Sequence, residues 1–182
     1  MEKLSLFLTP PYNCSYLTTQ QAQVAVVDPS IPMTTQLYNY LLTQGFRRSG
    51  NEVYSPYCSH CSACVPVRVP VSEFDCNRQQ RRCQRKNQHT QVKIKPMIFD
   101  PQHFELYQYY QQQRHHQGSM QYHQAEEYWQ FFHSEWCDTI LVEFWRESTL
   151  IAVAVIDQLP NALSAVYTFF HPQFSQYSLG MY

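Results

Sequence analysis

Glycine is scarce in this chain and supplies only 4 of its 182 residues. Neither GxGxxG nor GxxxxGK[ST] occurs, and these glycine-rich loops are the usual mark of nucleotide-binding folds. Long apolar runs are also missing: the longest, Leu150 to Ile156, suits a buried strand and is far shorter than the roughly 18–20 residues of a membrane helix. The apolar start of the chain is too short for a signal peptide, since Pro10-Pro11 ends it. We therefore expect a folded cytoplasmic protein without a membrane partner.

The cysteines do not follow the pattern of a secreted protein. There are 7 of them, whereas disulfide frameworks normally have an even number, so we expect reduced thiols. Cys58, Cys61 and Cys64 are three residues apart, the spacing of one side of a metal knuckle. The candidates for a fourth ligand are Cys14, Cys76, Cys83 and His60. Zinc or iron–sulfur binding, thiol sensing, and a purely structural role as small apolar side chains all stay open.

Positive charge is concentrated in one segment. The chain carries a net charge of −1, but residues 68–95 hold 8 of the 13 Lys and Arg residues and only 2 of the 14 Asp and Glu residues. That segment is therefore +6 (8 − 2) and the remainder −7 (5 − 12). A basic segment on an acidic protein indicates a local anionic partner, with nucleic acid as the first candidate.

A polar helix is predicted within this segment, from Asn77 to Gln88. Arg78, Arg81, Arg82 and Arg85 recur at helical spacing and fall on one face. No acidic residue follows them at i+4, so this stripe favours phosphate binding, for which the arginine fork is well suited. The alternative is a solvated surface helix.

The pattern along the rest of the chain predicts a mixture of helices and strands, with a lobe boundary near Pro96–Pro101. Helices are expected over 34–44, over 101–114 after an Asp100 cap, and over 124–134. A loop around Gly118-Ser119 is expected over 115–123. Strands are expected over 3–9, 53–55, 66–71, 91–96, 139–145, 150–158 and 163–170.

The last two predicted strands bring polar side chains together. Asp157 ends an apolar run, and Ser164 and Tyr167 follow on the next strand after a hairpin-sized turn. Such groups can converge on one site, although ordinary turn polarity would also explain them. They do not form a Ser–His–Asp signature.

Several of these stretches together resemble one family, the aminoacyl-tRNA–protein transferases of the N-degron pathway. The resemblance spans nearly the whole chain and keeps its order. The matching stretches are Cys14-Ser-Tyr-Leu17, Tyr57 to Val69, Phe74, Asn77 to Asn87, Arg114-His115, Gly118-Ser-Met120, Val142-Glu143-Phe144, Ala152 to Tyr167 and Ser178-Leu179-Gly180. The three-cysteine spacing before Val65-Pro-Val-Arg68 is similar to the bacterial branch.

That branch transfers leucine from leucyl-tRNA to proteins that begin with Asp or Glu, marking them for degradation. The resemblance implies an α+β fold with a cysteine-bearing N-terminal lobe over residues 1–97 and a GNAT-like acyltransferase lobe over 98–182. Members of the family continue beyond the Ser-Leu-Gly motif, so we expect this chain to be truncated at its C-terminal end.

The resemblance also implies roles for single residues. Asp157 would bind the incoming α-ammonium group or take its proton, Ser164 and Tyr167 would orient the ester, and Arg68 would bind the acidic side chain of the acceptor. The tRNA would contact Arg78, Arg81, Arg82, Arg85 and Lys86. Cys14, Cys58, Cys61 and Cys64 are the candidate metal ligands.

No cofactor is expected to be required, and neither DNA nor a membrane is an expected partner. Three alternatives to a leucyltransferase stay open. The first is an arginyl-tRNA–protein transferase, and the second is a non-catalytic zinc-knuckle RNA-binding protein. The third is a thiol or iron–sulfur sensor.

Overall fold

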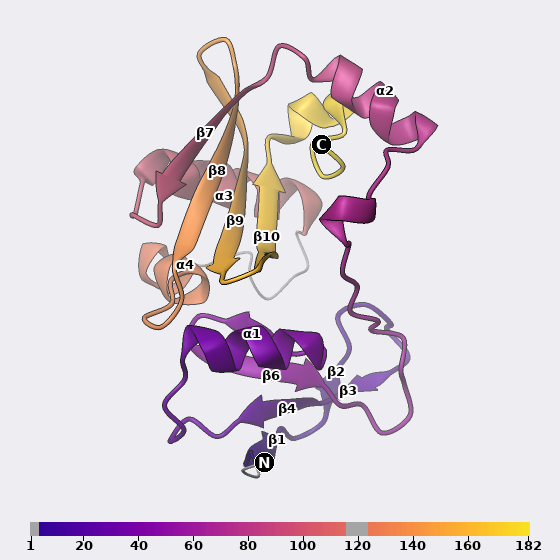
Figure 1. The fold of residues 1–182 in the computed structure, drawn as a ribbon, viewed down its shortest axis with the longest axis vertical. Helices are drawn as coiled ribbons and strands as arrows, with labels where there is room; N and C mark the ends of the chain where they lie inside the picture. Colours follow the sequence, from indigo (N-terminus) through magenta and orange to yellow (C-terminus); the bar gives the residue numbers. More distant parts are fainter. Residues whose placement is uncertain (1–3, 116–123) are drawn as a thin grey trace.

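The computed structural model describes residues 4–115 and 124–182, so the expected loop around Gly118-Ser119 lies outside the described residues. The chain forms two lobes, one at each end of its long axis (Figure 1). Each lobe contains an antiparallel sheet with helix packed beside it, which is the expected α+β class. The finer assignment to a GNAT-like fold stays a prediction. Within the described residues, no helix is both long and apolar enough to cross a membrane.

The N-terminal lobe holds a four-stranded sheet in the order β1-β4-β6-β5 and a two-stranded ribbon, β2-β3. Its strands are β1 (Leu6–Leu8), β2 (Tyr12–Asn13), β3 (Gln21–Ala22), β4 (Val24–Val27), β5 (Arg47–Ser49) and β6 (Glu52–Pro56). Helix α1 (Thr35–Thr43) buries Tyr38 and Leu41 in a cluster with Val27 and Val53. The prediction of this helix from its apolar spacing is confirmed.

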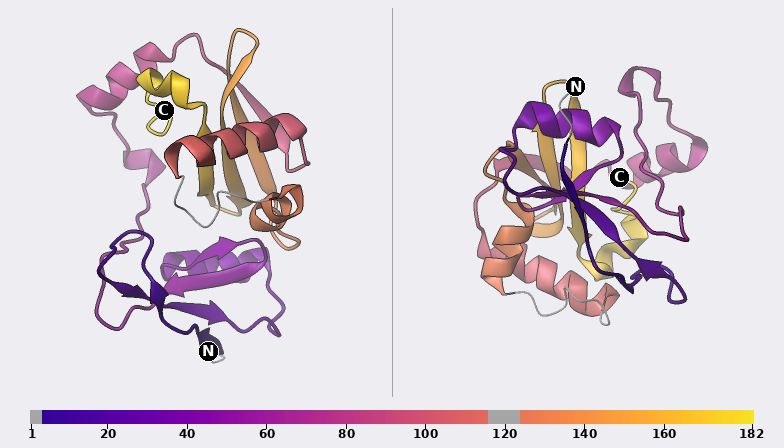
Figure 2. Two further views of the ribbon diagram at one scale, coloured as in Figure 1. Left: turned by 180° about the vertical axis from the view of Figure 1, so that it is seen from behind. Right: turned by 90° about the horizontal axis from the view of Figure 1, so that it is seen from below.

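The C-terminal lobe holds a sheet in the order β10-β9-β8-β7. Its strands are β7 (Gln91–Pro96), β8 (Thr139–Arg146), β9 (Thr149–Leu159) and β10 (Ala162–Phe170). The predicted hairpin is confirmed, because Ala162 pairs with Leu159 across a two-residue turn. Helices α3 (Pro101–Arg114) and α4 (Ala125–Phe132) cover one face of this sheet (Figure 2).

Aromatic side chains form the core between this sheet and its helices. Tyr107, Tyr128, Phe132 and Phe169 are all almost completely buried. Tyr128 and Phe132 have ring centroids 4.9 Å apart, and Tyr107 lies 5.5 Å from Phe169, both edge to face. Each such pair adds about 0.5–1.5 kcal/mol beyond its area burial. This core packs against one face of β9 and β10.

The basic helix α2 (Arg78–Lys86) is anchored to the C-terminal lobe. Its single buried residue, Cys83, directs its thiol at the carbonyl oxygens of Tyr177 and Ser178, each 3.6 Å away. Asn87, one turn later, donates from Nδ2 to the Tyr177 carbonyl at 2.8 Å. Helix α2 therefore sits beside the short 3-10 helix η2 (Pro172–Tyr177), away from the first sheet (Figure 1).

These contacts place the start of the second lobe earlier than composition suggested. Strand β7 lies on the N-terminal side of the expected boundary between residues 97 and 98, yet it pairs with β8 along its whole length. Sheet pairing and the anchoring of α2 therefore both assign residues from about 78 onward to the C-terminal lobe.

One predicted strand is wrong. Residues 66–71 alternate valine with other residues, but the structure places no strand between Tyr57 and Pro70, and Val71 opens the 3-10 helix η1 (Val71–Glu73). Val67 and Val71 are 87% and 85% exposed, so their alternation does not mark a buried face. Pro66 and Pro70 lack the N–H donors that a paired strand needs. The segment is an extended surface loop.

Gly50 allows the two lobes to approach closely. Its backbone N–H donates to the carbonyl of Phe131 at 2.8 Å, and its φ of +56° lies in the left-handed region. A Cβ added there would collide with the backbone carbonyl of Gln130. Only glycine fits this approach without displacing α4.

Gly50→Ala should therefore lower the free energy of unfolding by at least about 2 kcal/mol, through left-handed strain and steric overlap with backbone. Chemical denaturation of both proteins measures the change. Gly180→Ala is the matched control, because a Cβ at Gly180 meets no atom within 4 Å. Equal stability of the two variants would contradict this account of the lobe contact.

Candidate active site between the two lobes

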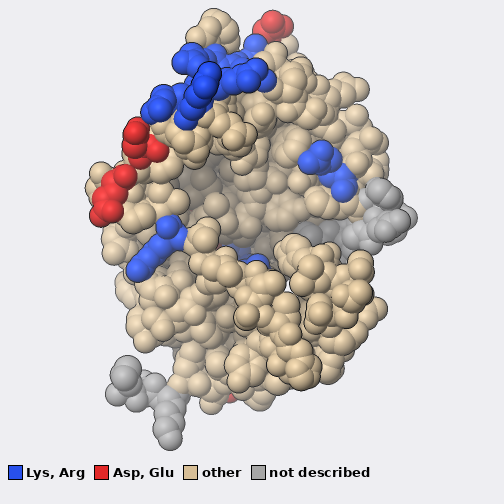
Figure 3. Space-filling model, turned by 90° about the vertical axis from the view of Figure 1, so that its right-hand side faces the viewer, with Lys and Arg blue, Asp and Glu red and all other residues tan. Residues whose placement is uncertain are grey.

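The face that carries the basic residues is hollowed between the lobes (Figure 3). The largest group of Lys and Arg side chains on this face lies over α2, at the rim above the hollow (Figures 1 and 3). We call this group the α2 basic surface; its members, all exposed, are Arg78, Arg81, Arg82, Arg85 and Lys86. The structure thus keeps together all five residues that the sequence assigned to tRNA binding.

Few interactions within the protein neutralise the α2 basic surface. Arg81 lies 3.5 Å from Asp75, a carboxylate that is 93% exposed. Lys86 donates to the carbonyl of Gln176 at 3.1 Å. An exposed ion pair contributes little in water, so the surface keeps nearly its full positive charge for a partner.

A β-bulge brings two of the predicted site residues onto one face of the sheet. Ser164 pairs with Asp157, and the register shifts between Ala165 and Tyr167, so that Tyr167 pairs with Val155. Residues three apart on a regular strand point to opposite faces. The extra residue of the bulge reverses this, so Ser164, Tyr167 and Asp157 share one face. The register therefore places all three predicted side chains on one face of the sheet, and their roles stay a prediction.

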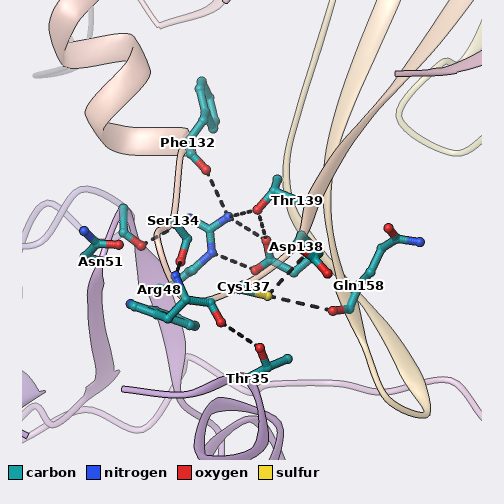
Figure 4. Close-up of polar contacts among 12 residues, drawn as sticks. Thr35, Arg48, Asn51, Phe132, Ser134, Cys137, Asp138, Thr139 and Gln158 are labelled. Atoms are coloured by element: carbon teal, nitrogen blue, oxygen red, sulfur yellow. Dashed lines mark hydrogen bonds and ion pairs between the residues drawn. The ribbon is translucent and has the colours of Figure 1, made fainter. Parts of the chain in front are cut away.

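Both carboxylate oxygens of Asp157, however, already have hydrogen-bond partners within the protein. Its side chain is fully buried and accepts hydrogen bonds from Arg48 Nε at 2.7 Å and Arg48 Nη2 at 2.6 Å. The hydroxyl of Thr139 donates to it at 2.8 Å. Figure 4 shows the Arg48 guanidinium between strand β8 and α4. A carboxylate held in this way has no direct access to a substrate amine.

Every nitrogen of the Arg48 guanidinium donates a hydrogen bond. It also donates to the carbonyl oxygens of Gly50 at 3.2 Å and Phe132 at 3.0 Å, as well as to the Thr139 hydroxyl at 3.0 Å. The pair joins β5 of the first lobe to β9 of the second. Complete hydrogen bonding is what a buried ion pair requires to offset its loss of hydration. Asp157 therefore has a structural role: its ion pair with Arg48 connects the two lobes.

Tyr38 adds a second link at the same place. It is 1% exposed, and its hydroxyl interacts with the side chains of both Ser164 and Asp157. Burial, and then the negative charge of Asp157, raise its pKa well above the ordinary value. Its ring also packs edge to face on Trp136, with centroids 4.9 Å apart. Tyr38 therefore packs at the contact between the lobes, near Ser164.

Tyr167 is the member of the predicted trio that is best placed to act on a substrate. It is partly exposed, and its hydroxyl oxygen accepts a hydrogen bond from Nε2 of the buried Gln111 at 2.9 Å. Burial raises its pKa, and Gln111 works in the opposite direction. The hydroxyl stays protonated at neutral pH. Its proton is not used in the bond with Gln111, so the hydroxyl can donate it to another acceptor.

The candidate metal ligands line one cavity but do not converge. The N-lobe cavity, of about 800 Å³, is walled by the β2–β3 ribbon, residues 14–17, residues 45–47, residues 56–58 and residues 61–66. Cys14, Cys58, Cys61 and Cys64 all face it. Among the described residues, only Asp100, His103 and Glu143 bring three ligand atoms within 4.8 Å of one another. The four sulfurs therefore do not form a closed tetrahedral site in this arrangement.

The Asp100, His103 and Glu143 group already has internal partners. His103 Nε2 lies 2.9 Å from Glu143 Oε1, and Trp145 Nε1 donates to Glu143 Oε2 at 2.8 Å. Asp100 caps α3 by accepting from the Gln102 N–H. These bonds tie α3 to β8.

The residues that complete the site carry no signal in the sequence that would have identified them. Arg48, Tyr38 and Gln111 lie far along the chain from their partners: 109 residues separate Arg48 from Asp157, and 56 separate Gln111 from Tyr167. No local spacing connects such pairs. Arg68, the expected acceptor-binding residue, is exposed on the surface loop between Tyr57 and Pro70, and its role stays a prediction.

Arg48→Met should destabilise the protein by about 3–5 kcal/mol, because it leaves the Asp157 carboxylate buried without a counterion. The midpoint of thermal unfolding should fall by about 10 °C or more. The double variant Arg48→Met/Asp157→Leu removes both charges and should recover most of this loss. A single variant that melts like the original protein would show that the pair does not hold the lobes together.

Comparison with known proteins identifies the family of this chain. The model of the N terminus of arginine-tRNA-protein transferase matches residues 12–82, and the model of its C terminus matches residues 102–182. Aspartate/glutamate leucyltransferases of Pseudomonas aeruginosa (strain UCBPP-PA14) and Pseudomonas fluorescens (strain Pf0-1) are each 43% identical over 182 residues, which is 100% of this chain and 77% of theirs. That of Saccharophagus degradans is 43% identical over 183 residues, 78% of its length. The chain belongs to the arginine-tRNA-protein transferase family.

Proposed function

We propose that this protein transfers leucine from leucyl-tRNA to the α-amino group of proteins that begin with Asp or Glu. The observation that carries the proposal is the 43% identity to aspartate/glutamate leucyltransferases over all 182 residues. The α2 basic surface and the hollow beneath it supply a place for the tRNA and its 3′ end. The resulting mark would direct the acceptor protein to degradation.

The reaction is the aminolysis of an ester. The acceptor nitrogen attacks the carbonyl carbon of the leucyl ester, a C–N bond forms, and the C–O bond to the tRNA ribose breaks. The nitrogen loses a proton and the ribose oxygen gains one. An α-amino group has a pKa of about 7.7–8.0, so a useful fraction is neutral at pH 7.

This chemistry removes the need for Asp157 as a base. Its oxygens are occupied by Arg48 and Thr139, and the neutral amine is already nucleophilic. Holding the two reactants together supplies most of the acceleration. Asp157 contributes indirectly, by fixing β9 against the first lobe.

Tyr167 stabilises the charge that develops on the ester oxygen. Because Gln111 donates to its hydroxyl oxygen, the Tyr167 proton points away from Gln111 and is available to the carbonyl oxygen. A fixed donor at a developing oxyanion is among the largest contributions that a site makes to catalysis. Ser164, on the same face, helps to orient the ester.

The α2 basic surface binds the tRNA backbone. Arginine forks pair with phosphate oxygens, and contacts of this kind supply affinity without reading sequence. Since α2 is fixed to the C-terminal lobe by Cys83 and Asn87, it holds the tRNA in a constant position relative to Tyr167.

The family name also points to a second donor, arginyl-tRNA. The direct test incubates the protein with labelled leucyl-tRNA or arginyl-tRNA and peptides that begin with Asp, Glu, Lys or Arg. We expect leucine to appear on the Asp and Glu peptides alone. Arginine on the Asp peptide would establish the second donor instead, and no transfer from either tRNA would refute the proposed function.

The double variant Arg78→Gln/Arg82→Gln should weaken leucyl-tRNA binding. It should also make the negative slope of log association constant against log salt shallower by about 1–2, because each lost phosphate contact removes about 0.7–0.9. A filter-binding series at several salt concentrations measures this slope. Lys93→Gln/Lys95→Gln is the control, since it removes two positive charges from β7 in the same basic segment. An equal effect of both pairs would mean that net charge, and not the α2 basic surface, governs binding.

A further inference from the structure

The N-lobe cavity has a single charged residue in its wall. Of its 22 lining residues only Arg47 is ionised at neutral pH, and none is Asp or Glu. The rest are aromatic, aliphatic, amide, hydroxyl or thiol side chains. A cavity with one cation and no carboxylate suits a ligand that has one negative group and some apolar surface.

Arg47 has its hydrogen-bonding capacity free. Its guanidinium lies over the Tyr54 ring, 5.2 Å from the centroid, and among the described residues it has no recorded hydrogen bond or ion pair. Tyr54 pairs with Arg47 across β5 and β6, so the ring supports the guanidinium from the neighbouring strand. The Tyr12 hydroxyl also lies near Arg47: burial raises the pKa of Tyr12, and Arg47 partly opposes this rise.

The strand that carries Arg47 leads to the transfer site. Arg47 and Arg48 are consecutive in β5, so their side chains point to opposite faces. Arg48 reaches Asp157 in the second lobe, and Arg47 faces the cavity. Tyr16, in the wall of the same cavity, is close enough to Tyr167 to add to the rise in its pKa, after the larger effect of burial. Strand β5 therefore connects the cavity, through Arg47, to the contact between the lobes, through Arg48.

We propose that Arg47 binds the side-chain carboxylate of the acceptor's N-terminal Asp or Glu inside the N-lobe cavity. This inference rests on the proposed function and replaces Arg68 with Arg47 as the residue that selects acidic acceptors. The carboxylate accepts from the guanidinium, with the Tyr12 hydroxyl as a second donor. The α-amine is then directed towards Tyr167 and the ester.

A tRNA phosphate is the competing ligand for Arg47. Nucleic acid backbones are bound by rows of cations, such as those on the α2 basic surface, whereas this cavity offers one. Its lining of Tyr12, Tyr16 and Tyr57 fits a short peptide end. The observations therefore favour the peptide.

The test measures peptide binding without tRNA. Isothermal titration calorimetry compares a hexapeptide that has a free N-terminal Asp with the same peptide beginning with Asn, which has the same shape and no charge. The original protein should prefer the Asp peptide by about ten- to a hundredfold, the value of a charge-assisted hydrogen bond. Arg47→Gln should abolish this preference and leave binding of the Asn peptide nearly unchanged. Lys95→Gln, on the edge strand of the other lobe, should keep the full preference.

Three results would overturn the inference. One is an Arg47→Gln variant that retains the preference for Asp. Another is loss of the preference in Arg68→Gln and not in Arg47→Gln. The third is an effect of Arg47→Gln on tRNA affinity alone. If the Asp preference depends on Arg47 but the original protein transfers no amino acid, the proposed function fails, and the assignment of Arg47 as a binding site for acidic N-termini is retained.

Discussion

The buried ion pair between Arg48 and Asp157 determines how the two lobes meet. It joins an edge strand of one sheet to an inner strand of the other, and the groups around it complete its hydrogen bonds. Gly50, Thr35 and Asn51 then contact the segment of residues 131–136 beside it. Because a buried charge without its partner is costly, this pair tolerates little rearrangement. The positions of the cavity, the hollow and Tyr167 relative to one another follow from it.

The fold was largely predictable because its elements are marked locally. The Asp100 cap with Pro101, the stripe of arginines after Asn77, and the two-residue turn after Leu159 all carry signals within a few residues, and each predicted element is present. The strand over 66–71 was wrong because alternation predicts a strand only where another strand is free to pair. Whether such a neighbour exists is decided by tertiary structure.

The site was only half predictable, for the same physical reason. Pattern and family resemblance identified Asp157, Ser164 and Tyr167, and the hairpin register brings them to one face. They could not reveal that Asp157 already has a partner, since Arg48 lies 109 residues earlier in the chain. The contact between the lobes thus changes the interpretation of Asp157 from a catalytic base to a residue that connects the two lobes.

The left-handed turn at Gly50 also fixes which face of β5 each of the two neighbouring arginines, Arg47 and Arg48, occupies. In a strand, a shift of one residue exchanges the two faces, so a slip of β5 would bury Arg47 and turn Arg48 outward. Both side chains are arginines, and hydrophobicity alone would not oppose the exchange. The short connection from β5 to β6 and its fixed pairing of Arg48 with Val53 prevent it. Turn geometry, not side-chain chemistry, decides which arginine is structural and which faces the N-lobe cavity.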